Sequence, residues 1–261
     1  MNWEPAVRTL GRSLRADLDR LLTIANPRGS LYRDAHYYSA TVEIADPDAM
    51  RQWLPAGLRL AEPARADVFT AWFPDYNFGD TGYHEAAIFV HVKTLQGTGI
   101  HCPWMILDDD VALILGREGA GYPKKLGEIT WSKTDTEIRA EAGRRGHKLL
   151  TMSGRLGEII QDAPPFLGRP HRNVMGLIGV AFPSWLVGFT PAEKNIEVRR
   201  VEDFTLEISG SERDPLDQMG LGRVVEARLH RVDLFSTNLP PIPLRPLSPL
   251  FAATHLRPRI L

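Results

Sequence analysis

The sequence predicts an α+β protein built on one large antiparallel β-sheet, and three observations support this fold class. Many runs of β-branched, aliphatic and aromatic residues follow one another along the chain. Several are joined by short Gly or Asp/Thr turns, which favour antiparallel neighbours. Strand-like and helix-like runs do not alternate regularly, as they would in a parallel sheet with crossover helices. We expect one domain over residues 1–261, with a sheet curled into a barrel or cone and a few peripheral helices.

The N-terminal third predicts two helices and a strand. Residues 1–26 carry apolar side chains at every third or fourth position between arginines and aspartates, a spacing typical of an amphipathic helix. The β-branched and aromatic run 37–44 predicts a strand. Asp46 can then cap, and Pro47 can begin, a short helix that ends before Pro55.

The rest of the chain reads mostly as strands. The alternating or apolar runs predict strands at 67–73, 86–95, 111–115, 136–142, 147–156, 196–209 and 222–235. The uncharged run 174–189 is broken by Pro183 and is shorter than a membrane-spanning helix, so we expect it to form core or pocket wall. The proline-rich tail, residues 236–261, is expected to be extended.

Composition excludes several classes of function. The net charge is −1, with no basic stripe for phosphate backbones, so nucleic acid is not expected as a partner. One cysteine, Cys102, cannot form an internal disulfide framework, and the first residues lack a secretory signal. We therefore expect a cytoplasmic protein without a membrane partner. The apolar stripes of the first helix and the tail favour a homo-oligomer.

Several motifs resemble known sites only in part. The run YHEAAIFV begins like a zinc-protease helix, but Ile88 stands where the second histidine would be. The spacing of His84, His91, His101 and Cys102 does not require a metal site. Neither GREGAGYP nor MGLGRV has the glycine order of a dinucleotide loop, and there is no GxSxG motif. We expect no metal.

The segment GREGAGYPKKLGEI, residues 116–129, places two lysines side by side. Lysines are usually exposed, so a solvated loop is the ordinary interpretation. Here an apolar run leads in, Gly119 and Gly121 permit close backbone approach, and Pro123 fixes the entry to Lys124. This context favours the delivery of one lysine into a pocket.

That segment resembles the signature of the acetoacetate decarboxylase-like superfamily, in which the first lysine of Tyr-Pro-Lys-Lys-Leu-Gly forms a Schiff base with a ketone. The run DPDAMRQWLP resembles an early helix of the superfamily, and GYHEA resembles the segment that carries its active-site glutamate, here Glu85. The resemblance covers residues 30 to 130. It implies the superfamily's fold, Lys124 as nucleophile, Glu85 as acid/base, and no cofactor other than the covalent lysine Schiff base.

The proposed nucleophile requires a lowered pKa. A free lysine has a pKa of about 10.4, so about one amine in a few thousand is neutral at neutral pH. Acetoacetate decarboxylase is itself the standard example of a lysine activated by desolvation or a neighbouring cation. Lys125 is the candidate neighbouring cation. Adjacent strand residues point to opposite faces, however, so we expect desolvation to dominate and Lys125 to pair outward with Glu118 or Glu128.

The sequence departs from the decarboxylase pattern at two polar positions. Where the superfamily implies an arginine and a second glutamate, this chain has His36 and Thr70. We take both as candidate substrate-binding residues, together with Glu118 and Tyr122. Each also has an ordinary interpretation: a strand histidine or threonine, a surface carboxylate, or a tyrosine packed on the sheet.

The resemblance implies a lyase that acts on small keto acids, with two possible outcomes. A protonated imine can lose carbon dioxide from a β-keto acid, or lose an α-proton and condense with an aldehyde. Because His36 and Thr70 break the decarboxylase set, the sequence favours aldol condensation and dehydration of pyruvate-like 2-oxo acids with aldehydes. Acetoacetate decarboxylation is the alternative. A third is a non-catalytic barrel that binds a small ligand, with Lys124 in a salt bridge.

Overall fold

The computed structural model describes Arg15 and residues 30–76, 81–178, 180–235 and 241–248. The helix expected over residues 1–26, apart from Arg15, and most of the tail at 236–261 lie outside the described residues. Within the described part, no helix combines the length and the apolar character needed to cross a membrane.

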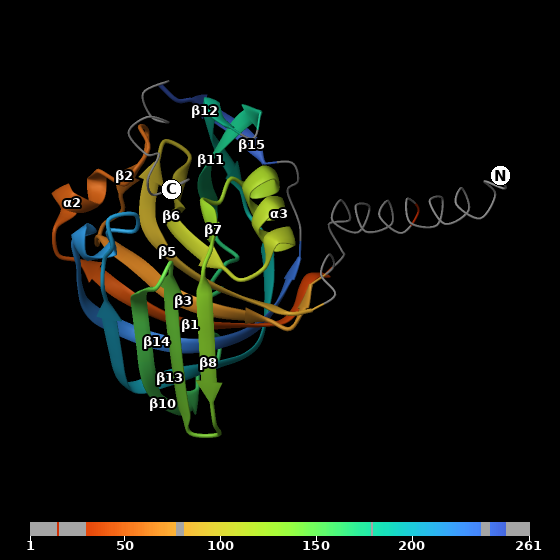
Figure 1. The fold of residues 1–261 in the computed structure, drawn as a ribbon, viewed down its shortest axis with the longest axis vertical. Helices are drawn as coiled ribbons and strands as arrows, with labels where there is room; N and C mark the ends of the chain where they lie inside the picture. Colours follow the sequence, from red (N-terminus) through yellow and green to blue (C-terminus); the bar gives the residue numbers. More distant parts are fainter. Residues whose placement is uncertain (1–14, 16–29, 77–80, 179, 236–240, 249–261) are drawn as a thin grey trace.

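All the described strands join one sheet, which confirms the predicted α+β class (Figure 1). Its path is β15-β12-β11-β6-β5-β3-β1-β14-β13-β10-β9-β8, with β2 on β5, β4 on β1 and β7 on β6. Neighbours are antiparallel except at β6, which runs parallel to β11 and β7. The path is open between β15 and β8, so the sheet curls without closing into a hydrogen-bonded barrel. The strands are β1 Ser30–Ile44, β2 Arg59–Leu60, β3 Arg65–Phe73, β4 Asp75–Tyr76, β5 Tyr83–Thr94, β6 Gly97–Leu107, β7 Lys124–Leu126, β8 Glu128–Lys133, β9 Glu137–Arg144, β10 His147–Ile159, β11 His171–Ile178, β12 Val180–Phe189, β13 Ala192–Ile208, β14 Leu221–Phe235 and β15 Ile242–Pro246.

The helices are α2 (Pro47–Arg51), α3 (Asp110–Ala120) and the 3-10 turn η1 (Leu216–Gln218). Helix α2 forms as predicted, and the Asp46 side chain accepts hydrogen bonds from the backbone N–H groups of Asp48 and Ala49, both at 3.0 Å. The strand predicted at 111–115 is wrong, because these residues form the first half of α3. Asp109 caps α3 by accepting from the Ala112 N–H at 2.6 Å, which overrides the β-propensity of the apolar run.

The sequence prediction also missed strands that lack clear alternation. β6 is buried almost throughout, and β7 is only three residues long. β8 was also missed. The uncharged run 174–189 supplies residues 174–178 of β11 and the whole of β12. Residues 242–246 of the tail form β15 against β12.

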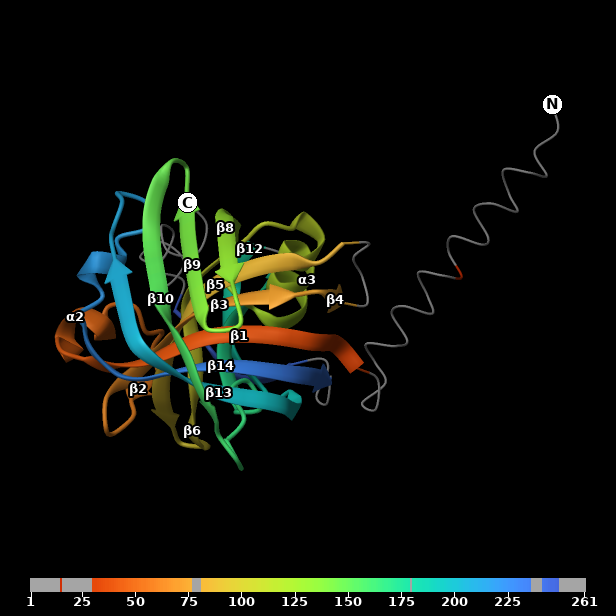
Figure 2. The same ribbon diagram turned by 90° about the horizontal axis from the view of Figure 1, so that it is seen from below.

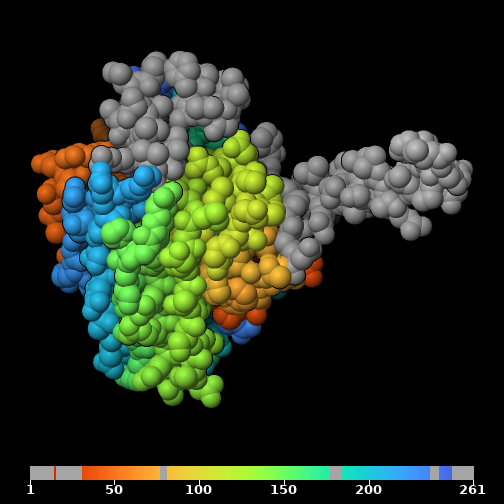
Figure 3. Space-filling model, in the orientation of Figure 1, coloured from red at the N-terminus to blue at the C-terminus, as the bar shows by residue number. Residues whose placement is uncertain are grey.

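Consecutive residues of β1 face two different parts of the core. Tyr37 packs with Phe69 and Phe89 on one face, whereas Tyr38 packs on the other face with Met152 and residues of β9. β1, β14 and β13 run side by side in the sheet (Figure 2). In the space-filling view, β8 to β10, in green, form much of the front surface, with α3, in yellow-green, to one side (Figure 3). The site described next lies on the Tyr37 face.

Candidate active site

Local structure directs the two lysines of the GREGAGYPKKLGEI segment to different places. Helix α3 ends at Gly121, whose φ of 68° lies in the left-handed region that glycine adopts readily. Tyr122 and Pro123 then lead into β7, where Lys124 lies opposite Met105 of β6. Because adjacent strand residues point to opposite faces, only Lys124 turns toward the Tyr37 face.

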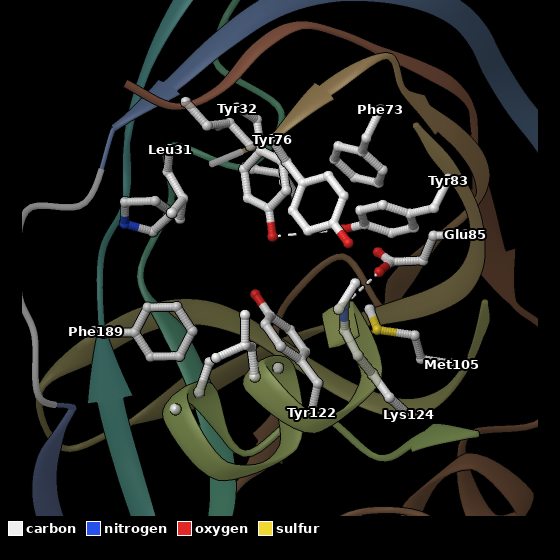
Figure 4. A pocket seen from close by; sticks show the side chains of 18 of the residues that line it. Leu31, Tyr32, Phe73, Tyr76, Tyr83, Glu85, Met105, Tyr122, Lys124 and Phe189 are labelled. Atoms are coloured by element: carbon white, nitrogen blue, oxygen red, sulfur yellow. Dashed lines mark hydrogen bonds and ion pairs between the residues drawn. The ribbon is translucent and has the colours of Figure 1, made fainter. Parts of the chain in front are cut away.

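Lys124 forms a buried ion pair with Glu85. Its Nζ lies 2.8 Å from Glu85 Oε2, and the two side chains are 5% and 7% exposed (Figure 4). Glu85 comes from β5, two positions after Tyr83, so both of these side chains project from the same face of that strand. The predicted separation of Lys124 from bulk solvent is therefore seen in the structure.

The direction of the Lys124 pKa shift differs from the sequence-based expectation. Burial is the largest single influence and lowers this pKa, but Glu85, Tyr32 and Cys102 together outweigh burial, so the pKa is raised above its usual value. The expectation considered desolvation and a second cation, and it omitted the carboxylate in direct contact. In the unliganded site, the stable form is thus an ammonium paired with a carboxylate.

A glycine of α3 makes room for the Lys124 side chain. A Cβ built on Gly116 would lie 2.4 Å from Lys124 Cε and 2.9 Å from Nζ. By contrast, a Cβ on Gly119 would meet nothing within 4 Å, although Gly119 also lines the cavity. Gly116, rather than the expected Gly119, therefore allows the close approach of Lys124. The close approach expected at Gly121 is seen against β11, where a Cβ would lie 2.7 Å from the Val174 carbonyl oxygen.

Lys124 and Glu85 lie in a cavity of about 200 Å³. Its walls are chiefly aromatic and aliphatic, and among the described lining residues Lys124 and Glu85 are the only charged side chains. The aromatic walls consist of Tyr32, Tyr37, Phe73, Tyr76, Tyr83, Phe89, Tyr122, Phe189 and Phe235. Apolar walls with few polar groups are typical of small-molecule sites.

Three tyrosines surround the ion pair. Nζ of Lys124 lies 5.6 Å from the ring centre of Tyr83 and 5.9 Å from that of Tyr122, within range of cation–π attraction. The Tyr83 and Tyr32 hydroxyl oxygens are 3.4 Å apart (Figure 4). Sequence reasoning missed Tyr32 and Tyr83. The position of Tyr83, two residues before Glu85, was a usable signal.

Tyr122 lines the cavity, but its hydroxyl is engaged elsewhere. Its oxygen lies 2.9 Å from Nδ1 of His171, whose Nε2 lies 3.0 Å from the Leu167 carbonyl. Burial lowers the pKa of His171 to about 3, so the imidazole is neutral. Because His171 Nε2–H donates to the Leu167 carbonyl, Nδ1 accepts a hydrogen bond from the Tyr122 hydroxyl. Tyr122 therefore serves as a wall whose hydroxyl is fixed by His171.

Lys125 lies on the other side of β7. It pairs with Asp214, which also accepts from Arg144 at 3.0 Å and from Trp104 Nε1 at 2.9 Å. The expected pairing of Lys125 with Glu118 or Glu128 is therefore wrong, because the side chain turns into the protein rather than outward. The largest influences on the pKa of Lys124 are burial, Glu85, Tyr32 and Cys102, and Lys125 is not one of them.

The remaining predicted substrate-binding residues do not line the cavity. His36 and Thr70 belong to the opposite face of the sheet from Tyr37, because of strand alternation. His36 Nε2 lies 3.4 Å from Asp34, and Thr70 is fully buried. Glu118 is exposed on α3. The structure thus brings together Lys124, Glu85 and Tyr122 and excludes His36, Thr70 and Glu118.

Comparison with known proteins identifies the family. The sequence profile described as acetoacetate decarboxylase (ADC) matches residues 23–240. The chain belongs to the acetoacetate decarboxylase family. Among relatives of this family, acetoacetate decarboxylase 1 of Mesorhizobium japonicum is 31% identical over 138 residues, covering 49% of this chain and 55% of the relative. Acetoacetate decarboxylase of Clostridium acetobutylicum is 33% identical over 107 residues, covering 41% and 43%. The chain thus matches about half the length of these relatives.

Several solved structures share the fold of this chain. Acetoacetate decarboxylase from Legionella pneumophila superposes with a TM-score of 0.69 and 16% identity, covering 82% of this chain and 86% of that one. The enduracididine biosynthesis enzyme MppR, complexed with pyruvate, gives a TM-score of 0.65 and 17% identity, covering 80% and 91%. At these identities, the likeness concerns the fold.

Proposed function

We propose that this chain is a Schiff-base-forming lyase that acts on small keto acids, with Lys124 as nucleophile and Glu85 as acid/base. One observation carries the proposal: a lysine and a carboxylate, 2.8 Å apart and shielded from solvent, face an otherwise apolar cavity. Family membership supports it. No organic cofactor is required, because an iminium can accept the electron pair that a cofactor would otherwise accept.

Activation of Lys124 uses its partner. The ammonium gives a proton to Glu85, which leaves a neutral amine beside a neutral acid. In water, this transfer is strongly unfavourable. Burial disfavours both charges, so it reduces the free-energy difference between the ion pair and the neutral pair. A substrate that fills the cavity and displaces water promotes the transfer further. The ion pair is therefore the resting form, and the neutral pair is the reactive one.

Decarboxylation then follows from the iminium. Lys124 Nζ attacks the ketone carbon, and Glu85 returns its proton as the carbinol oxygen leaves as water. The bond from the α-carbon to the carboxyl carbon breaks, carbon dioxide departs, and the electron pair moves to the iminium nitrogen. A solvent proton delivered through Glu85 reaches the enamine carbon, and water releases the ketone. Overall, one β-keto carboxylate and one proton give one ketone and carbon dioxide.

The geometry supports this reaction better than condensation. The sequence-based preference for condensation relied on His36 and Thr70, and neither side chain lines the cavity. Among the described lining residues, only Lys124 is a cation, so a substrate carboxylate lies against apolar walls once Lys124 is in the imine. Loss of carbon dioxide removes that poorly solvated charge. The product ketone suits the same walls.

Condensation of a 2-oxo acid with an aldehyde is a second candidate. The paired Tyr32 and Tyr83 hydroxyls, 3.4 Å apart, could donate hydrogen bonds to an aldehyde oxygen as carbon–carbon bond formation makes it negative. MppR, which shares the fold, was solved with pyruvate. The enamine would then attack the aldehyde, and water would leave after a second proton transfer.

A trapping experiment tests the proposal. The protein is incubated with acetoacetate, pyruvate or a longer 3-oxo acid, reduced with borohydride and weighed by mass spectrometry. We expect an adduct that disappears in Lys124→Ala and persists in Lys125→Met. No adduct with any of these compounds would favour the non-catalytic binding barrel. Carbon dioxide release, compared with ultraviolet absorbance growth from pyruvate and an aromatic aldehyde, separates the two reactions.

A further inference from the structure

A second cavity lies farther along the same face of the sheet as the Lys124 cavity. Alternate residues of a strand share a face. On the neighbouring strands β5, β3, β1 and β14, this face carries apolar or aromatic residues near Lys124 and polar residues farther along. We call this cavity the Arg65 pocket; its volume is about 130 Å³. Its lining comprises Ser39, Thr41, Arg65, Asp67, His91, Pro164, Pro165, Phe166, Arg169, Glu226, Arg228 and His230.

One carboxylate of the Arg65 pocket is fully engaged. Asp67 accepts hydrogen bonds from Thr41 Oγ1 at 2.8 Å and Arg169 Nη2 at 2.7 Å, and it lies 2.8 Å from His91 Nε2. Burial alone raises the pKa of Asp67, but His91 and Arg169 outweigh burial and hold the pKa well below its usual range. Asp67 is thus ionised, and it already has three hydrogen-bond partners.

Two other polar groups of the pocket have no partner in the described part of the chain. Arg65 Nε is buried and lacks a hydrogen-bond acceptor, and Arg65 forms no ion pair with the described residues. His230 is 2% exposed, and its Nδ1 also lacks a partner. Buried polar atoms are normally hydrogen-bonded, so the unpaired Arg65 Nε at this cavity indicates a missing ligand. Arg65 lies opposite Glu43 of β1 and His230 lies opposite Tyr37, so the two groups do not share one small ligand.

The charges of the pocket identify the class of that ligand. Arg169 pairs with Asp67 at 2.7 Å and Arg228 with Glu226 at 2.7 Å. Burial lowers the pKa of His230 to about 3, so this imidazole is neutral at physiological pH. Among the described lining residues, the Arg65 guanidinium is therefore one positive charge in excess of the carboxylates. A small anion with several acceptor oxygens complements both that charge and the unpaired Arg65 N–H.

We propose that the Arg65 pocket binds a small oxyanion, a carboxylate or an inorganic phosphate, at the Arg65 guanidinium. This site is separate from the Lys124 cavity but shares a wall with it. The Phe166 ring centre lies 5.2 Å from that of His230 and 5.4 Å from that of Tyr37, which lines the Lys124 cavity. The oxyanion site does not depend on the reaction proposed at Lys124.

Calorimetric titration with sodium phosphate and with sodium acetate, at constant ionic strength maintained with chloride, tests the proposal. We expect saturable binding of at least one anion, and the tighter binder identifies the source as phosphate or carboxylate. Arg65→Gln should weaken binding at least about tenfold, since it removes hydrogen bonds to a charged group. Arg65→Lys, which keeps the charge but lacks Nε, should weaken it less.

Two further variants locate the anion. Arg200→Gln changes an arginine of β13 that lies outside the pocket and is half exposed, and it should leave binding unchanged. Lys124→Ala should also leave binding unchanged while abolishing borohydride trapping, so failure at one site is distinguishable from failure at the other. Absence of saturable binding by either anion, undiminished binding in both Arg65 variants, or loss of binding in Lys124→Ala would overturn the proposal.

Discussion

Lys124 and Lys125 are neighbours on one short strand, yet their surroundings differ. Both are buried, and each contacts a carboxylate. Asp214, the partner of Lys125, also accepts from Arg144 and Trp104, so one carboxylate is shared by three donors. The Lys124–Glu85 pair lies in the apolar cavity instead. A carboxylate shared by three donors stabilises one conformation, whereas a single pair in an apolar cavity has room for a reactant.

The pKa shifts of the two lysines point in opposite directions. Burial, the largest influence, lowers the pKa of Lys125, with Arg144 and Arg117 contributing in the same direction against Asp214. The pKa of Lys124 is raised, because Glu85 and other groups outweigh burial. The lysine with the lowered pKa is therefore not the one that lies with Glu85 in the apolar cavity. Reactivity depends on access to substrate and on a proton acceptor, as well as on pKa.

The largest effect is expected from Lys124→Ala. This change removes the nucleophile, so turnover of a β-keto acid should fall at least about 10³-fold. The measurement is carbon dioxide release under steady-state conditions, with circular dichroism as a check on folding. Lys125→Met is the matched control and should retain most of the borohydride adduct. Equal losses of adduct in the two variants would remove the distinction between the lysines.

Lys125→Met should instead destabilise the fold. It leaves buried Asp214 without one of its two cations, and breaking a buried ion pair costs about 3 kcal/mol or more. Urea unfolding at neutral pH measures this loss. Lys124→Met should lose less stability, because Glu85 borders the cavity and can be hydrated there. A greater loss in Lys124→Met would reverse the assignment of structural and chemical roles.

Glu85→Gln should change both rate and pH dependence. Loss of the acid/base should lower turnover by about 10²-fold. The carboxylate raises the pKa of Lys124, so its removal leaves burial to lower that pKa, and the ammonium should release its proton at a lower pH than in the parent protein. The pH profile of borohydride trapping reports the midpoint. Glu85→Asp keeps the charge, and we expect a smaller change. An upward or unchanged midpoint in Glu85→Gln would contradict the assigned influence of Glu85.

The raised pKa of Lys124 also has a consequence for stability. A group whose pKa is higher in the folded than in the unfolded protein stabilises the fold fully below its unfolded value. That contribution disappears as pH rises through the folded value. The Lys124 contribution to the free energy of unfolding should therefore be present at neutral pH and lost in strong alkali. Urea unfolding measures the free energies of unfolding of the parent and Lys124→Met proteins between neutral and alkaline pH. The two values should converge at the alkaline end.

Gly116→Ala gives the smallest of these expected effects. The added methyl group would lie 2.4 Å from Lys124 Cε, so the lysine must shift, and we expect adduct formation to slow by about tenfold. Gly119→Ala is the control on the same helix, since its Cβ would have no neighbour within 4 Å. It should keep the rate and add up to about 1 kcal/mol of stability through helix propensity. Similar rates for the two variants would show that Gly116 does not position Lys124.

The sheet and the ion pair were predictable from the sequence to different degrees. Alternation identified most long strands, and the lysine segment with GYHEA led to Lys124 and Glu85. The run 111–115 misled because its β-propensity resembles that of a strand, and only the Asp109 cap decides for a helix. Strand β6 was missed because a strand buried on both faces shows no alternation.

The rest of the site depends on which face of the sheet each side chain occupies and on the pairing register of the strands. The spacing of residues in the sequence did not determine either. His36 and Tyr37 are adjacent, and only Tyr37 lines the cavity, so a shift of one position exchanges inside for outside. Asp214 could not be assigned to Lys125, because it lies 89 positions later in the chain. Oligomeric state and cellular location stay predictions.

The distance along the chain between Lys125 and Asp214 bears on how the site matures during synthesis. The ribosome makes the lysine segment well before it makes the residue that neutralises Lys125. Until Asp214 emerges and docks, β7 carries a cation that opposes its burial beside β6. A nascent or truncated chain that ends before position 214 therefore cannot set the nucleophile in its final place, and reactivity toward ketones should appear only after translation has passed Asp214.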